Sequence, residues 1–316
     1  MKYKNITVLI LILVGLTSLY GVSENAGTTG FSFLKITYSA HAAAKANAFT
    51  GQADRIETLF FNPAGVAAIE GNSVSTSYIS YVNGFQGGSA AYVFPYNEAV
   101  NLGVYSQFLG INNIERTEVD EFNNYVPGTG TFGANNILFG IAGGMEVHEL
   151  LSVGVGLKMI RESLDDHSAL VVAVDLGLLH QTNNENLKVG ASLRNFGKQL
   201  TYYTDDKYEE KLPLMGVVGF SYSPQDKLTA NLDINKPFDQ SFNVSAGVEY
   251  VVHSMLALRA GYNTRGQNWK LGGDYEYLSG LSTGFGLNWK QYTLDYAITS
   301  YGDLGLINQV SFKFDF

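Results

Sequence analysis

The sequence contains no cysteine and little charge for its length. The absence of cysteine excludes disulfide bonds and a lipid-attachment cysteine behind a signal sequence. Charged residues make up 16% of the 316 residues, against roughly 25% in a typical soluble protein. The net charge of -9 argues against a nucleic-acid partner, because such partners are bound by basic surfaces.

Long apolar runs are also missing, apart from one at the N-terminus. A membrane-spanning helix needs about 20 consecutive apolar residues, and the only comparable run, Ile6–Leu16, is shorter. Lys2 and Lys4 precede this run, and a small-x-small triplet follows it at residues 21–23. The pattern predicts a Sec signal peptide at residues 1–23, with a retained N-terminal anchor as the alternative.

The sequence is rich in aromatic residues and glycine, and its apolar residues recur with a period of two. Aromatic residues make up 13% of the chain and there are 35 glycines, yet the mean hydropathy is only +0.01. Residues 306–316 alternate most clearly, and residues 256–262 and 281–289 repeat the pattern. Such alternation predicts β-strands with one apolar face and one small or polar face.

The composition of the second face distinguishes a membrane barrel from a soluble sandwich. A soluble sheet usually exposes charge on its outer face, whereas here that face is mostly Gly, Ser and Asn, which suits a lumen. The strands are about 9–12 residues long, enough to cross a bilayer at a tilt. Trp289 and Tyr292 lie near strand ends, where an aromatic girdle is expected. We therefore predict an all-β fold, a transmembrane antiparallel β-barrel at residues 72–316 in a Gram-negative outer membrane, with a soluble β-protein as the alternative.

The number of strands follows from an even-number rule and from loop lengths. About fifteen segments alternate, but single-chain bacterial barrels have even numbers of strands. If Asn268–Tyr277 is an extracellular excursion, about fourteen strands remain. The long segments Ile111–Ala134 and Thr201–Lys211 are then extracellular loops, and the short links Glu146–Glu149 and Pro224–Asp226 are periplasmic turns.

The C-terminal strand ends on an aromatic residue. Phe312, Phe314 and Phe316 share its apolar face. This arrangement resembles the signal that the barrel-assembly machinery recognises. Such recognition requires an exposed edge strand with an apolar face that can be paired during insertion. The expected surroundings of the mature barrel are outer-membrane lipid and lipopolysaccharide.

Residues 24–71 differ from the rest of the chain and are predicted to form an N-terminal segment. Ser39–Asn47 is rich in alanine, and a helix is plausible through Ile69. The Asn-Pro pair within this segment favours a turn, and Gly65 permits a positive φ. The turn is either a plug, or hatch, inside the barrel or only a helix-ending turn before the first strand. The candidate hatch motif is Phe60, Phe61, Asn62, Pro63, Ala64 and Gly65.

Charged residues on the predicted lumen face are structural candidates. They can pair with one another inside the barrel or hold the hatch, and internal charge in a barrel is more often structural than catalytic. The five histidines form no HExxH motif or close pair for zinc, so no metal and no cofactor are expected. The lumen candidates are Lys158, Arg194, Arg259 and Asp295.

Two short matches to catalytic motifs lack the necessary context. Residues 128–133 match GxGxxG, but a dinucleotide site needs a preceding strand and a following helix. Residues 280–284 match GxSxG, but a nucleophile elbow needs a strand-to-helix turn, and no His–acid partner is evident. We do not expect an enzyme.

An ordered set of motifs resembles the PorV/PorQ family of outer-membrane proteins. The set begins with residues 29–36 and continues with Asn47–Thr50 and the Asn-Pro-Ala-Gly stretch. Its last members are residues 257–262 and 302–305. The chain departs from the family pattern at Ala44-Lys45-Ala46, where glycines are usual, and at Arg55-Ile56-Glu57, where small residues are usual. The resemblance implies a fourteen-stranded FadL-like barrel with an N-terminal hatch in the lumen.

The resemblance leaves two functions to compare. The first, which the resemblance favours, is an accessory role in type IX protein secretion and surface attachment, with secretion-system proteins or cargo as partners of the extracellular loops. The second is FadL-type transport of a hydrophobic ligand, which requires an apolar pocket between hatch and wall beside a kinked strand. A passive porin is a third possibility, which a hatch disfavours. Fold alone does not decide among them.

Overall fold

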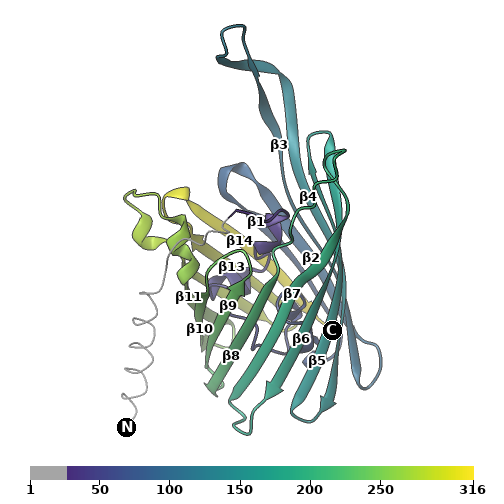
Figure 1. Cartoon of the computed structure of the whole chain (residues 1–316). Coiled ribbons are helices and arrows are strands. Elements are labelled where there is room, and N and C mark those ends of the chain that lie inside the picture. The colour runs from purple at the N-terminus through teal and green to yellow at the C-terminus, as the bar shows by residue number, and fades with distance from the viewer. Residues whose placement is uncertain (1–26) are drawn as a thin grey trace.

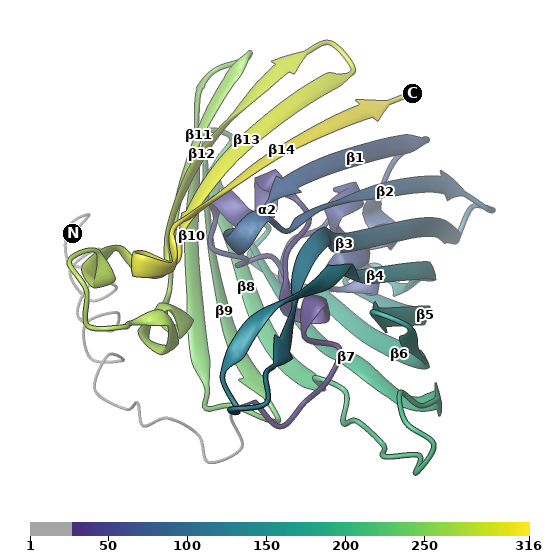
Figure 2. The same cartoon turned by 90° about the horizontal axis from the view of Figure 1, so that it is seen from above.

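Fourteen antiparallel strands form a closed barrel in the computed structural model, which describes residues 27–316 (Figures 1 and 2). Each strand pairs with its neighbours in the chain, and β14 closes the barrel by pairing with β1, where Val310 lies opposite Tyr78. Closure leaves no unpaired backbone edge, as a wall in lipid requires. The predicted antiparallel barrel of fourteen strands is confirmed, while the predicted signal peptide at residues 1–23 lies outside the described residues.

The strands are β1 Ser73–Ser80, β2 Gln86–Pro95, β3 Val100–Val119, β4 Tyr125–His148, β5 Leu151–Leu164, β6 His167–Gln181, β7 Leu187–Thr201, β8 Met215–Gln225, β9 Leu228–Pro237, β10 Asn243–His253, β11 Leu256–Asn263, β12 Leu281–Trp289, β13 Tyr292–Ser300 and β14 Leu306–Asp315.

The helices are short. The helix that the sequence makes plausible through Ile69 is only one turn of α-helix, followed by 3₁₀ turns. Ser39 caps the α-helix, and the positive φ values of Ala46 and Asn47 turn the chain away after it. Among residues 27–316 no helix is long and apolar enough to cross a bilayer. The helices are η2 Ser32–Lys35, α2 Ala40–Ala44, η3 Ile56–Phe60, η4 Pro63–Ala68, η5 Val82–Gly84, η6 Thr264–Trp269, η7 Glu276–Leu278 and η8 Gly302–Leu304.

The two faces of the wall differ as the alternation predicts. On β14, Ile307, Gln309 and Ser311 are buried inside the barrel. Val310 and Phe312, from the alternate positions, are each 40% exposed on the outside. Lipid can cover such an outward apolar band, whereas water cannot do so without a large hydrophobic penalty.

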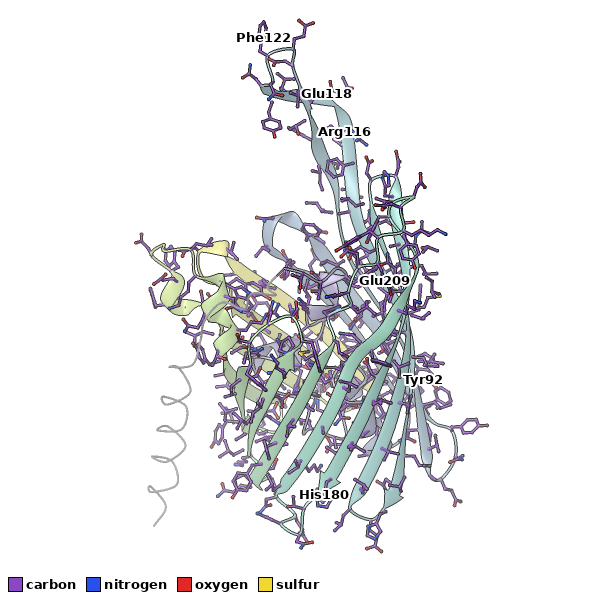
Figure 3. All side chains as sticks on the ribbon, viewed as in Figure 1. Tyr92, Arg116, Glu118, Phe122, His180 and Glu209 are labelled. Carbon is purple, nitrogen blue, oxygen red and sulfur yellow. The ribbon has the colours of Figure 1, made fainter. Side chains whose placement is uncertain are left out.

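The segment Ile111–Ala134, predicted as a loop, is instead a β-hairpin. β3 and β4 continue into it with Ile114 opposite Phe132, and the tip projects beyond the rest of the barrel (Figure 1), with Phe122 at its end (Figure 3). A two-stranded ribbon buries neither face, so it has no hydrophobic alternation for the sequence to reveal. The GxGxxG match at residues 128–133 lies within β4, without the helix that dinucleotide binding requires.

The excursion at Asn268–Tyr277 is confirmed as non-strand structure between η6 and η7. Trp269 packs against Tyr301 with ring centroids 3.8 Å apart. The Tyr275 N–H donates to the carboxylate of Asp303 at 3.0 Å. Contacts with the neighbouring β13–β14 loop, rather than strand pairing, therefore hold this segment in place.

Candidate functional site

The N-terminal segment, residues 27–70, lies inside the barrel (Figure 2) and is hydrogen-bonded to its wall. The Ala40 N–H donates to Ser311 Oγ on β14 at 2.8 Å. Asn101 on β3 donates to the carbonyl of Ile69 at 2.7 Å. The segment is therefore held to the wall at its α-helix and again at its C-terminal end.

The Asn-Pro turn of this segment starts a helix and anchors it. Pro63 occupies the first turn of η4, where the missing N–H of proline leaves no acceptor without a partner. The side-chain oxygen Oδ1 of Asn62 accepts a hydrogen bond from the Ala64 N–H at 3.2 Å. Asn62 Nδ2 donates to the carbonyls of Thr50 and Leu178, each at 2.9 Å. Leu178 belongs to β6, so one amide connects two parts of the segment to the wall. The turn also follows η3, as the helix-ending interpretation predicted.

Glycines allow the close approach of the segment to the wall. A Cβ on Gly154 of β5 would lie 2.3 Å from the backbone nitrogen of Ala64. Gly65 does not have the positive φ that the sequence suggested. Its role is close packing, because a Cβ there would lie 2.7 Å from Cγ2 of Thr58.

The two phenylalanines before the turn face different partners. Phe60 meets Tyr105 of β3 edge to face, with centroids 5.5 Å apart. Phe61 packs on Phe49 at 5.2 Å, and the Arg194 guanidinium lies over the Phe61 ring at 5.6 Å. The predicted motif therefore contributes aromatic surface inside the barrel.

A buried charge cluster joins the segment to β10, β11 and β13. Arg259 donates to Glu249 at 2.5 Å and to Asp295 at 2.6 Å, and Arg259 and Asp295 are 4% and 1% exposed. From the segment, Arg55 lies 3.9 Å from Asp295 and 3.3 Å from Glu57. The predicted lumen residues Arg259 and Asp295 are thus brought together, and they face charges of the segment.

His41 and Lys45 lie in the same cluster without exposure to solvent. Burial, and then the Arg259 guanidinium, hold the pKa of His41 well below its ordinary value, so its ring is neutral at neutral pH. The His41 ring nitrogens are 3.6 Å from Glu249 and 3.8 Å from Asp295. Burial lowers the pKa of Lys45 to about 7, although Glu249 opposes the shift.

The cluster is better suited to holding the segment than to holding a metal. The ligand atoms of His41, Glu57 and Asp295 lie within 4.8 Å of one another. The carboxylates are already matched by Arg55 and Arg259. A divalent cation would therefore add unbalanced positive charge to a buried site, which is unfavourable.

A second buried group lies on β5, β6 and β7. Lys158 pairs with Asp175 at 2.5 Å and donates to Asn195 Oδ1 at 2.9 Å. Arg194 is different, because no Asp or Glu in residues 27–316 lies within ion-pair distance of it. Of the four predicted lumen residues, three therefore have a carboxylate or guanidinium partner and Arg194 has none.

Two hollows lie on opposite sides of the wall near Lys158. The lumen cavity has a volume of about 80 Å³, and the outer hollow, on the lipid-facing side, about 800 Å³. Tyr105 and Lys158 line both. The lumen cavity is lined by these two residues with Phe60, Phe61 and Arg194, among others. The outer hollow is lined by the same two residues with Phe139, Leu157, Met159, Val172 and Phe196, among others.

The wall is irregular beside the outer hollow. The pairing of β6 with β7 shifts register between Val174 and Leu176, opposite Asn195, which has a φ of 63°. Ala173 and Gly197, which are paired across β6 and β7, present almost no side chain to the hollow. A bulge of this kind bends the strand and locally disrupts the ladder.

Comparisons with solved structures show the same architecture at low sequence identity. The Ralstonia pickettii toluene transporter TbuX is 13% identical, with a TM-score of 0.59 over 87% of this chain and 97% of that one. The P. putida toluene transporter TodX is 12% identical, with a TM-score of 0.62 over 88% and 98%. A Pseudomonas aeruginosa FadL homologue is 11% identical, with a TM-score of 0.57 over 89% and 99%. The sequence matches no family model and none of the curated proteins.

The fold is that of a FadL-like outer-membrane barrel. These structural neighbours are transporters and channels rather than enzymes. None of these comparisons identifies the PorV/PorQ family, so that finer resemblance stays a prediction from sequence motifs.

Sequence reasoning missed several buried charges of the site. Asp175 and Glu249 occupy inward positions on β6 and β10, and alternation alone could have placed them in the lumen. Lys45, Arg55 and Glu57 were noticed only as departures from a family pattern. Their role depends on contacts with strands about 200 residues away, which local sequence does not specify.

The predicted assembly signal lies on the outer face of the last strand. Tyr292 of β13 stacks on Phe314 at 4.9 Å, and Phe314 stacks on Phe316 at 5.0 Å. Phe312 stacks on Tyr292 at 5.9 Å. Recognition of these side chains by the assembly machinery stays a prediction.

Proposed function

We propose that this protein transports a hydrophobic small molecule across the outer membrane and releases it sideways through the wall. The observation that carries this proposal is the pair of hollows that share Tyr105 and Lys158. Among the described residues, these two line both the lumen cavity and the outer hollow, so the two hollows face each other across the same part of the wall.

The chemistry of the outer hollow suits an apolar solute. Its rim carries Phe139, Leu157 and Met159, which are 50–53% exposed on the lipid-facing side. Transfer of an apolar molecule from water to such a surface, and from there to lipid, is favourable. The small residues Ala173 and Gly197 pair across β6 and β7 in the lining of this hollow.

The N-terminal segment supports a lateral route over a straight one. In the proposed role of a hatch, the segment would obstruct the lumen, where it is anchored on one side by Asn62 and on the other by the charge cluster around Arg259. An open aqueous path along the barrel axis, which a passive porin requires, is disfavoured. The known transport of toluene by the structural neighbours TbuX and TodX agrees with an apolar substrate.

A pair of matched substitutions on the lipid face tests this function. Val172→Trp places an indole in the outer hollow, whereas Val155→Trp places the same group on neighbouring β5, outside the hollow. We expect uptake of labelled toluene by cells to fall strongly with Val172→Trp and to stay unchanged with Val155→Trp. Equal uptake by the two variants, at equal amounts of folded barrel, would exclude the lateral route.

The second candidate is the accessory role in type IX secretion implied by the PorV/PorQ resemblance. The feature that favours it is the β3–β4 hairpin, which has Phe122 at its tip (Figure 3). Phe122 and Tyr125 are each 84% exposed. An exposed aromatic tip is a common element of protein-binding surfaces. Affinity purification from native outer membrane tests this role, since secretion components should be recovered with the intact chain and lost when residues 120–124 are replaced by Asn-Gly.

A further inference from the structure

We propose that the outer face of the barrel binds a phosphorylated glycolipid of the outer leaflet, with Arg161 on its phosphate. The site is a further hollow on the outside of the wall, at the base of the β3–β4 hairpin, and is called the rim hollow below. This inference does not depend on the proposed transport function, because the rim hollow shares no lining residue with the lumen cavity or the outer hollow.

The rim hollow lies where the hairpin leaves the barrel. Its volume is about 650 Å³, and its lining includes Phe108 and Ile137, whose exposure of 51% and 38% places it on the outside of the wall. The pairing of β3 with β4 shifts register between Ile111 and Ile114, and Asn113 between them has a φ of 63°. A bulge of this kind bends the strand and interrupts the ladder.

The lining changes from apolar to polar toward the hairpin. Phe108 and Ile137, which are paired across β3 and β4, border the hollow on the side of the apolar band. Asn112 and Asn135 border it on the side of the hairpin, where Asn135 Nδ2 donates to Asn112 Oδ1 at 3.3 Å. Loop length assigns this end of the barrel to the extracellular side. The rim hollow therefore lies at the level where acyl chains meet headgroups in the outer leaflet.

Arg161 lies at this boundary without a counterion. It is opposite Ile137 on β4 and is the charged residue of the rim hollow among the described residues. No Asp or Glu in residues 27–316 lies within ion-pair distance of it, since Asp165 is paired with Arg116 instead. Its contact with the Ser168 hydroxyl is long, at 3.5 Å. An exposed cation beside the lipid is stabilised by an anion of the lipid itself.

The order of side chains matches the order of groups in a phosphorylated glycolipid. The apolar pair suits acyl chains. The guanidinium can donate two parallel hydrogen bonds to a phosphate. The asparagine amides and the Ser163 hydroxyl offer donors and acceptors to sugar hydroxyls. The volume falls within the range of about 300–1,000 Å³ of ligand sites, so the rim hollow can hold a phosphate and a sugar ring. A free phosphate ion would leave the apolar part of the site unused.

The test uses the full-length barrel purified in detergent micelles, with native mass spectrometry to measure dissociation constants. The two probes are lipid A that carries its phosphates and the same lipid A after removal of the phosphates. Arg161→Gln should weaken binding of the phosphorylated probe at least about tenfold and leave the other probe unaffected. Arg161→Lys should have a smaller effect, because lysine keeps the charge but not the paired donors.

The matched control is Arg116→Gln. Arg116 is also partly exposed and belongs to the hairpin, but it is paired with Asp165 and does not line the rim hollow. Its replacement should leave binding of both probes unchanged.

A further variant keeps the test decisive if Arg161→Gln does not assemble. Ser163→Glu places a carboxylate two residues along the same face of β5, where it can pair with Arg161 and repel a phosphate. It should weaken the phosphorylated probe as Arg161→Gln does. Equal affinity of the unmodified barrel for the two probes, or equal weakening by Arg116→Gln, would overturn the site. Displacement of lipid A by an equal concentration of inorganic phosphate would overturn its assignment to a lipid.

Discussion

Replacing Arg259 with leucine should destabilise the barrel by about 3–5 kcal/mol. Arg259 is 4% exposed and donates to two carboxylates, Glu249 at 2.5 Å and Asp295 at 2.6 Å. Leucine leaves both carboxylates without their closest cation, and Asp295 is itself 1% exposed. Removal of one partner of a buried ion pair has a large effect because the remaining charge stays desolvated.

An exposed ion pair of the same length provides the control. Arg116 lies 2.5 Å from Asp165, but their side chains are 39% and 31% exposed. Arg116→Leu should therefore leave stability almost unchanged, because solvent screens an exposed ion pair. The assay is equilibrium unfolding in urea, followed by the fluorescence of the two tryptophans. Equal destabilisation by Arg259→Leu and Arg116→Leu would refute the assignment of Arg259 as the centre of a buried cluster.

Three further predictions concern the N-terminal segment and the last strand. Asn62→Ala removes a helix cap and two bonds to carbonyls, so it should destabilise the segment by about 1–3 kcal/mol; faster proteolysis of the segment within an intact barrel would show this. The pKa of Lys45 is about 7 in the folded chain and about 10 in the unfolded chain. Between pH 7 and pH 10 the unfolded chain therefore binds more protons than the folded chain, so the free energy of unfolding should rise with pH over this range. Lys45→Met should remove this slope in pH-dependent unfolding, and an unchanged slope would count against the assignment. Deletion of Phe316 should reduce the yield of assembled barrel in the outer membrane, measured by heat-modifiable migration, whereas Phe122→Ala at the hairpin tip should not.

The barrel itself could be predicted from the sequence because lipid imposes a simple rule on each strand. Every wall strand must show apolar side chains outward, and β14 obeys this with Val310 and Phe312 outside and Gln309 and Ser311 inside. The hairpin beyond Ile111 could not be predicted in this way, because it leaves the membrane and has no buried face.

The candidate site was less accessible to sequence reasoning. Arg259 and Asp295 could be placed on the lumen face by alternation, but their pairing follows from the register between β11, β12 and β13. The contact of Arg55 with Asp295 joins residues 240 positions apart, and nothing in the local sequence indicates it. That no carboxylate of residues 27–316 lies within ion-pair distance of Arg194 is likewise visible only in the folded chain.

The distribution of polar contacts indicates which side chain moves during lateral release. Displacement of the N-terminal segment would break the buried contacts of Arg55 and of Asn62. Movement of Lys158 would break its ion pair with Asp175, which is also buried. Rotation of Tyr105 breaks no hydrogen bond, because its hydroxyl has none in the described part of the chain. Among these movements, rotation of Tyr105 is therefore the one that breaks no polar contact, although its ring packs against Phe60 and Gly140.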